Sequence, residues 1–167
     1  MTRDYVLDLD AAEDRAAMLS IFGGKITTYR KLAEHAMRDL APLLGAAEKP
    51  WTAGAVLPGG DIANADFDRF LETVERAYPA LPRTMLRRLA RAYGTRVRIL
   101  LGKAAQVDDL GTAFGGDLYQ AEIDYLVTHE WARTAEDILY RRSKLGLHVP
   151  AGTADRVAAY LKPGAPA

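Results

Sequence analysis

The 167-residue chain contains no cysteine, which excludes disulfide bonds, thiolate zinc sites and cysteine nucleophiles. It has no excess of charge of either sign, because 22 Lys and Arg residues balance 22 Asp and Glu residues. A bulk electrostatic attraction to nucleic acid or to an anionic membrane is therefore absent. No apolar run approaches the roughly 20 residues of a membrane-spanning helix, and the first residues lack the pattern of a signal peptide. These absences predict a cytoplasmic globular protein with one core and room for part of a second.

Histidine and serine are scarce, and neither occurs in a pattern that supports metal or serine-triad chemistry. One of the three histidines, His129, begins a segment that resembles the start of a zinc-protease helix. Arg133 stands where the second metal ligand of that motif would be, so a metal site is not predicted. The two serines, Ser20 and Ser143, lie outside any Gly-x-Ser-x-Gly motif. We predict no metal ligand and no catalytic residue in this chain.

The N-terminal part of the sequence has the pattern of a β-hairpin followed by a helix. Tyr5, Leu7 and Leu9 recur with a period of two, separated by Val6 and Asp8, and residues 17–22 form a second short apolar run that ends at two glycines. An apolar stripe of helical spacing then extends to Leu44, with Thr27 or Thr28 as its cap. A two-stranded hairpin is only marginally stable alone, so we expect this one to need a larger sheet.

The remainder of the sequence predicts short helices after a linker rich in proline and glycine. Apolar residues recur at helical spacing in several segments, which Gly, Pro or capping patterns bound. The predicted helices of this part begin near Phe67, Arg83, Thr95, Asp117, Thr134 and Ala154, and those at Asp117 and Thr134 open with capping boxes, Asp117–Gln120 and Thr134–Asp137. The predicted fold is mainly α, a small helical bundle preceded by a β-hairpin and one helix. We divide the chain into residues 1–45, a linker at 46–64, an all-helical domain at 65–162 and a tail at 163–167.

The most informative segment is the strand–glycine–helix junction Phe22–Arg30. Its two glycines let a ligand approach the backbone, and free N–H groups at a helix start favour a bound anion. Lys25 would add a mobile positive charge in the first turn. The alternative is a plain strand-to-helix turn with a threonine cap. The segment is not a Walker A loop, because Leu19 occupies the position of that motif's first glycine and Ile26 follows the lysine.

Basic residues gather in two other places. On and just after the predicted helix that begins near Arg83 they are Arg83, Arg87, Arg88, Arg91, Arg96 and Arg98. Acidic residues on the preceding helix would neutralise this face, so we prefer a solvated or domain-contacting face to a nucleic-acid interface. Near a later helix end, Arg141, Arg142 and Lys144 either complement the helix dipole or pair with another domain.

Several motifs follow one another along nearly the whole chain, from Thr2 to about Leu161. They are Thr2–Tyr5, Leu19–Glu34, Leu57–Asp61, Ala90–Gly94, Asp109–Gly111 and Glu130–Gly146. Together they resemble the C-terminal part of the FAD-dependent, respiratory sn-glycerol-3-phosphate dehydrogenases. The resemblance implies oxidation of glycerol 3-phosphate to dihydroxyacetone phosphate, with electrons passing through FAD to a membrane quinone.

The resemblance also assigns roles to residues of this chain. The cofactor-binding motif would comprise Gly23, Gly24, Lys25, Ile26, Thr27 and Thr28. The backbone of Lys25, Ile26 and Thr27 would bond a flavin carbonyl, where a helix start stabilises the charge of reduced flavin. The side chains of Arg3 and Lys25 would hold the substrate phosphate.

The sequence departs from the family in one large respect, because the dinucleotide fingerprint Gly-x-Gly-x-x-Gly does not occur. Met1 directly before Thr2–Tyr5 leads us to expect a truncated chain, which alone neither holds FAD nor turns over substrate. Residues 1–45 would end the FAD-binding domain, and their hairpin would expose its edges. The resemblance implies a full-length enzyme that is peripheral on the inner face of the cytoplasmic membrane, and it leaves a homodimer open. A helical protein-interaction module with no enzymatic parent is the alternative, but it gives no reason for a glycine pair followed by Lys25.

Overall fold

The computed structural model describes residues 4–12, 14–46 and 49–162. The chain forms two compact units, Met1–Val56 and Leu57–Ala167. The described residues form six α-helices and two small antiparallel sheets of two strands each, so the predicted mainly α fold with a β-hairpin is confirmed. The boundary between the units falls inside the linker predicted at residues 46–64.

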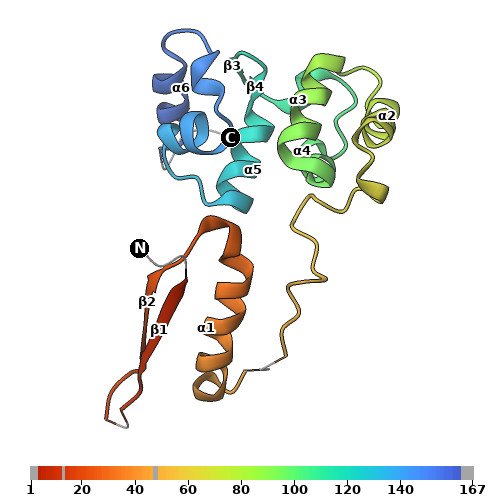
Figure 1. Cartoon of the computed structure of the whole chain (residues 1–167). Helices are drawn as coiled ribbons and strands as arrows, with labels where there is room; N and C mark the ends of the chain where they lie inside the picture. Colours follow the sequence, from red (N-terminus) through yellow and green to blue (C-terminus); the bar gives the residue numbers. More distant parts are fainter. Residues whose placement is uncertain (1–3, 13, 47–48, 163–167) are drawn as a thin grey trace. The chain divides into compact units, whose positions relative to one another are not determined.

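The first unit is an antiparallel hairpin with a helix packed against it (Figure 1). Its elements are β1 (Tyr5–Asp10), β2 (Met18–Gly23), a 3-10 turn (Ile26–Thr28) and α1 (Tyr29–Leu44). Tyr5 lies opposite Gly23 in the strand pairing. The hydroxyl of Tyr5 also forms a hydrogen bond with Nδ1 of His35, which ties α1 to the hairpin. The predicted strands and the end of the helix at Leu44 are confirmed.

Little of the first unit is buried. Among its described residues, only Ala41 is enclosed, whereas Val6, Met18 and Phe22 on the hairpin each expose more than half of their surface. A two-stranded sheet of this kind is marginal in water. Its exposed apolar side chains are typical of a surface that another part of a protein covers.

The second unit is a bundle of short helices around one core (Figure 1). Its elements are α2 (Phe67–Ala77), α3 (Arg83–Tyr93), α4 (Val97–Leu101), β3 (Ala113–Gly115), β4 (Leu118–Tyr119), α5 (Gln120–Glu130), a π-helix (Asp137–Arg142) and α6 (Thr153–Tyr160), with short 3-10 turns between them. Leu118, Ile123, Leu126, Ile138 and Val157 are completely buried. Because these side chains come from β4, α5, the π-helix and α6, the C-terminal elements share one hydrophobic core.

Two glycines fix the loop before α2 against the end of α3. A Cβ on Gly94 would lie 1.9 Å from the carbonyl oxygen of Gly59, so only glycine permits this contact. The N–H of Thr95 donates a hydrogen bond to the same oxygen at 3.0 Å. The Thr95 hydroxyl donates to the carboxylate of Asp61. Residues 57–61, which the sequence placed in a linker, are therefore a fixed part of the second unit.

The helix start predicted at Asp117 is wrong. Asp117 has a φ of 62° and lies in the turn of the β3–β4 hairpin, so residues 65–162 are not all helical as predicted. The hairpin is held by residues distant in sequence. The hydroxyl of Thr153 donates to the carbonyl oxygen of Phe114 at 3.0 Å, and Arg88 donates to that of Asp117 at 2.8 Å. These tertiary hydrogen bonds override the local capping pattern, and α5 begins only at Gln120.

Candidate functional site

The junction between β2 and α1 carries most of the residues to which the family resemblance assigns flavin and phosphate contacts. Gly23 and Gly24 have φ values of 84° and 98°, in the left-handed region that L side chains rarely adopt. A Cβ on Gly23 would lie 3.0 Å from the carbonyl oxygen of Asp4, and one on Gly24 would lie 3.1 Å from Cδ1 of Leu32. The two glycines therefore let the chain leave β2 and turn at once into the helix.

Lys25 and Thr28 close the 3-10 turn that follows. The carbonyl oxygen of Lys25 accepts hydrogen bonds from the N–H of Thr28 at 3.0 Å and from its hydroxyl at 2.9 Å. The N–H of Lys25 donates to the same hydroxyl at 3.4 Å. The predicted threonine cap is confirmed in position, because Thr28 is the N-cap residue of α1, but its side chain bonds to Lys25 and makes no capping hydrogen bond to α1.

The outer side of the turn presents hydrogen-bond donors. Ile26 and Thr27 are its first residues, so their N–H groups have no acceptor in a preceding turn. Lys25, Ile26 and Thr27 are all exposed, and Ile26 exposes 90% of its surface. The Lys25 ammonium adds a positive charge beside the positive end of the helix dipole. This arrangement can bind an anionic or carbonyl oxygen.

The structure thus brings Gly23, Gly24, Lys25, Ile26, Thr27 and Thr28 together in one turn. Arg3, the other residue assigned to the substrate phosphate, lies outside the described residues. In the described part of the chain, no group of three or more Asp, Glu or His side chains is placed to hold a metal ion. No described helix combines the length and the apolar character that a membrane crossing requires.

A buried ion pair between α3 and α5 is a feature that sequence analysis missed. Both terminal nitrogens of Arg88 donate to the carboxylate of Glu122, each at 2.8 Å. The hydroxyl of Tyr93 donates to the same carboxylate at 2.7 Å, and Glu122 is only 2% exposed. One sequence pattern could have revealed this ion pair. Glu122 is four residues from both Leu118 and Leu126, which places a carboxylate within an apolar helical stripe.

The ion pair changes the acid–base properties of its members. Burial raises the pKa of the Tyr93 hydroxyl, and the negative charge of Glu122 raises it further. Burial alone would lower the pKa of Arg88, but the hydrogen bonds and charge of Glu122 outweigh burial and raise it. Both Tyr93 and Arg88 therefore stay protonated at neutral pH, which suits a structural link rather than proton transfer.

Three other basic residues on and near α3 make contacts within the second unit. Their contacts are Arg83 with the Glu75 carboxylate at 2.8 Å, Arg98 with the Thr73 hydroxyl at 3.1 Å, and Arg91 over the Phe67 ring at 5.2 Å. This dispersal favours the interpretation of a face that contacts its own unit over a nucleic-acid interface.

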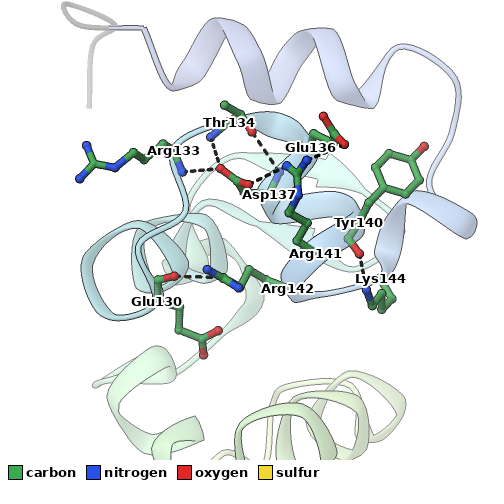
Figure 2. A network of polar contacts seen from close by, with 9 residues as sticks. All are labelled: Glu130, Arg133, Thr134, Glu136, Asp137, Tyr140, Arg141, Arg142 and Lys144. Atoms are coloured by element: carbon green, nitrogen blue, oxygen red, sulfur yellow. Dashed lines mark hydrogen bonds and ion pairs between the residues drawn. The ribbon is translucent and has the colours of Figure 1, made fainter. Parts of the chain in front are cut away.

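The segment from Glu130 to Lys144 forms a polar network (Figure 2). Asp137 accepts hydrogen bonds from the N–H groups of Arg133 and Thr134, each at 3.0 Å, and its own N–H donates to the Thr134 hydroxyl at 3.1 Å. These bonds, together with a bond from Arg141, lower the pKa of Asp137 to about 2. The predicted capping box is confirmed, but the helix that it opens is a π-helix.

Comparison with known proteins identifies the relatives of this chain. A family model described as the C-terminal domain of alpha-glycerophosphate oxidase matches residues 50–163. The chain is 47% identical over 161 residues to the aerobic glycerol-3-phosphate dehydrogenase of Escherichia coli (strain K12), which covers 96% of this chain and 32% of the relative. It is 49% identical over 149 residues to the D-erythritol 1-phosphate dehydrogenase of Brucella abortus (strain 2308), and this alignment covers 89% of this chain and 30% of the relative. It is 47% identical over 162 residues to a glycerol-3-phosphate dehydrogenase of Pseudomonas aeruginosa, and this alignment covers 97% of this chain and 31% of the relative.

The chain therefore spans about a third of the length of these relatives. The resemblance predicted from the ordered motifs is confirmed over nearly the whole chain. The chain belongs to the family defined by the C-terminal domain of alpha-glycerophosphate oxidase.

Proposed function

We propose that this chain is the C-terminal part of a flavin-dependent dehydrogenase that oxidises sn-glycerol 3-phosphate to dihydroxyacetone phosphate and passes the electrons through FAD to a quinone. The observation that carries the proposal is the exposed donor turn at Gly23–Thr28, in a chain 47% identical to two glycerol-3-phosphate dehydrogenases. Because the chain spans about a third of these relatives, the activity belongs to a polypeptide of their length.

The two units of the chain would have different roles in the full-length enzyme. Residues 1–45 would complete the FAD-binding domain, with the exposed face of the β1–β2 hairpin covered by the rest of that domain. Residues 65–162 would form a helical C-terminal domain whose contribution to catalysis is indirect. The full-length enzyme would act at the inner face of the cytoplasmic membrane, where its quinone is dissolved.

The donors of the turn fit one end of a flavin. FAD, when bound, supplies the two-electron acceptor of the reaction. Ile26 and Thr27 would donate their N–H groups to a flavin carbonyl, whereas the N–H of Lys25 already points to the Thr28 hydroxyl. A helix start stabilises the negative charge that develops there on reduction. The left-handed glycines contribute by setting the direction of the backbone.

Lys25 would bind the phosphate of the substrate together with Arg3. Its exposed ammonium is a mobile point charge, and a guanidinium can bond two phosphate oxygens at once. The two side chains would therefore hold the substrate by its charged end and leave its carbinol group to face the flavin.

The backbone contact can be tested by removing a single donor. Lys25 has φ −122° and ψ 148°, an extended conformation that suits a residue before proline, and Ile26 is the first residue of the turn. Ile26→Pro in the full-length enzyme should therefore keep the fold but delete one N–H. We expect the flavin potential to fall by about 30–60 mV, since a hydrogen bond to a charged group is worth about 1.5–3 kcal/mol. Ile26→Ala, which keeps the N–H, is the control, and an equal potential in both variants would contradict the contact.

D-Erythritol 1-phosphate is a second candidate substrate, because a relative with 49% identity is a D-erythritol 1-phosphate dehydrogenase. Both substrates carry a phosphate that Lys25 can bind, so this residue does not separate them. Initial rates of the full-length enzyme with each substrate at equal concentration decide between them. A higher kcat/KM for glycerol 3-phosphate supports the first assignment, and a higher value for D-erythritol 1-phosphate replaces it.

A further inference from the structure

A second candidate site lies in the second unit, at the C-terminal end of α5. An open cleft of about 400 Å³ is bounded there by Pro58, Tyr125 and Trp131, with Arg96 and Arg142 also in its wall. None of these residues belongs to the turn at Gly23–Thr28, so the cleft does not depend on the flavin assignment.

Both arginines are anchored through Nε, which leaves their terminal amino groups to a ligand. Nε of Arg96 donates to the hydroxyl of Tyr125, and the guanidinium carbon lies 5.4 Å from the centre of that ring. Nε of Arg142 donates to the carbonyl oxygen of Glu130 at 3.0 Å (Figure 2). Within the described residues, no carboxylate lies at ion-pair distance from either guanidinium. The neighbouring Arg141, in contrast, is paired with two carboxylates at 2.8 and 2.9 Å.

The backbone around the cleft is held in unusual conformations. Trp131 and Lys144 have φ values of 57° and 61°, although neither is glycine, and a π-helix lies between them. Such conformations persist only where the surrounding structure enforces them, and π-helical turns are frequent at functional sites. Hydrogen bonds from the N–H groups of Arg133 and Thr134 to Asp137 fix the segment between Trp131 and the π-helix. Trp131 is 79% exposed beside the cleft.

The charges at the cleft favour a phosphate over a carboxylate. One guanidinium can satisfy both oxygens of a carboxylate, whereas a phosphate has enough oxygens to accept from two guanidiniums. Glu130 opposes an anion, but in Figure 2 its carboxylate extends away from Arg142. Arg96 and Arg142 together outweigh that single negative charge. We propose that this cleft binds the phosphate group of a small molecule or of a lipid headgroup between Arg96 and Arg142.

The test uses the fluorescence of Trp131 in the 167-residue chain. The chain has two tryptophans, so Trp51→Phe leaves Trp131 as the only reporter. This variant is titrated at constant ionic strength with inorganic phosphate, with glycerol 3-phosphate, and with phosphatidylglycerol vesicles against phosphatidylcholine vesicles. We expect a saturable change in Trp131 fluorescence with at least one phosphate probe. The probe that binds most tightly indicates whether the phosphate is free, part of a small molecule or part of a lipid headgroup.

Variants at the cleft separate a binding site from a merely structural pair of arginines. Arg142→Ala and, independently, Arg96→Ala should weaken binding by about tenfold or more, since each removes charge-assisted hydrogen bonds. Glu130→Gln should tighten binding by about two- to fivefold, because it removes a repelling charge near the surface. Arg87→Ala, an exposed arginine on α3, is the matched control and should leave binding unchanged. Circular dichroism confirms that each variant is folded. No saturable change with any probe would overturn the proposal, and so would binding by folded Arg142→Ala and Arg96→Ala that is as tight as that of the parent Trp51→Phe variant.

Discussion

Arg88→Met should strongly destabilise the second unit. The substitution removes two hydrogen bonds to the carboxylate of Glu122 and one to the carbonyl oxygen of Asp117, all at 2.8 Å. Glu122 is only 2% exposed in the wild-type structure, and its one remaining donor would be the hydroxyl of Tyr93, which lies at 2.7 Å. Methionine keeps most of the apolar contacts of the arginine stem, so the measured effect reports chiefly on the stranded charge.

The expected loss in the free energy of unfolding is about 3 kcal/mol. Removing one partner of a buried pair costs roughly 3–5 kcal/mol, because the other charge is left without compensation. Two features place Arg88 at the lower end of that range. Its side chain is 25% exposed, and its Nε is buried without a hydrogen-bond partner among the described residues. In a unit of this size, a loss of this magnitude lowers the Tm by about 12 °C or more.

The assay is urea unfolding of the chain with Trp51→Phe, followed by the fluorescence of Trp131 in the second unit. Arg87→Met on the same helix is the control and should change the free energy of unfolding by less than about 0.5 kcal/mol. The double variant Arg88→Met/Glu122→Leu should recover most of the loss, since no buried charge remains. A loss below about 1 kcal/mol for Arg88→Met, or a double variant less stable than it, would refute the reasoning.

Three further predictions concern local contacts. Gly94→Ala should destabilise the chain by about 3 kcal/mol in urea unfolding, because its Cβ would lie 1.9 Å from the carbonyl oxygen of Gly59 in a left-handed conformation; unchanged stability would contradict the contact. Because the pKa of Asp137 is lowered from 3.8 to about 2, its stabilising contribution is complete above about pH 4 and is lost as the pH falls toward 2. Asp137→Asn should therefore reduce the loss of Tm between pH 5 and pH 2.5, and an unaltered pH profile would contradict this. Asp66→Ala should cost about 1 kcal/mol by thermal unfolding, since it removes the cap on the N–H of Arg69 at 3.0 Å, whereas Asp66→Asn should cost less.

Elements whose signals are local were predictable from the sequence. Helix α2 carries apolar residues at helical spacing, and Phe70, Leu71 and Val74 are its buried side chains. Helix α3 ends at Gly94 because the backbone there adopts a conformation that favours glycine. The capping box at Thr134–Asp137 was recognisable for the same reason, since its partners are three residues apart.

Features that depend on distant residues were not predictable. The local pattern at Asp117 resembles a helix cap, but hydrogen bonds from Arg88 and Thr153 hold this segment as a hairpin. The π-helix depends on a hydrogen bond from the N–H of Ser143 to the carbonyl oxygen of Ile138, at 3.0 Å, and no composition signal marks it.

The same distinction applies to the candidate sites. The turn at Gly23–Thr28 could be located from the sequence because it is one continuous segment whose glycines and threonines have local backbone roles, and its contact with flavin stays a prediction. The cleft between Arg96 and Arg142 was not, because its two arginines come from separate elements that only the fold brings to one wall.

The most direct test of the central claim is glycerol-3-phosphate:dye oxidoreductase activity in the full-length protein that contains this chain, measured beside Lys25→Ala and Arg3→Ala. We expect an active protein that contains flavin. We also expect both variants to keep their flavin but to show a strongly raised KM for glycerol 3-phosphate, because each loses a charge that holds the substrate phosphate. Unchanged kinetics in both variants would contradict the phosphate-binding roles. A full-length protein without flavin or activity would contradict the proposed function itself and favour a helical interaction module.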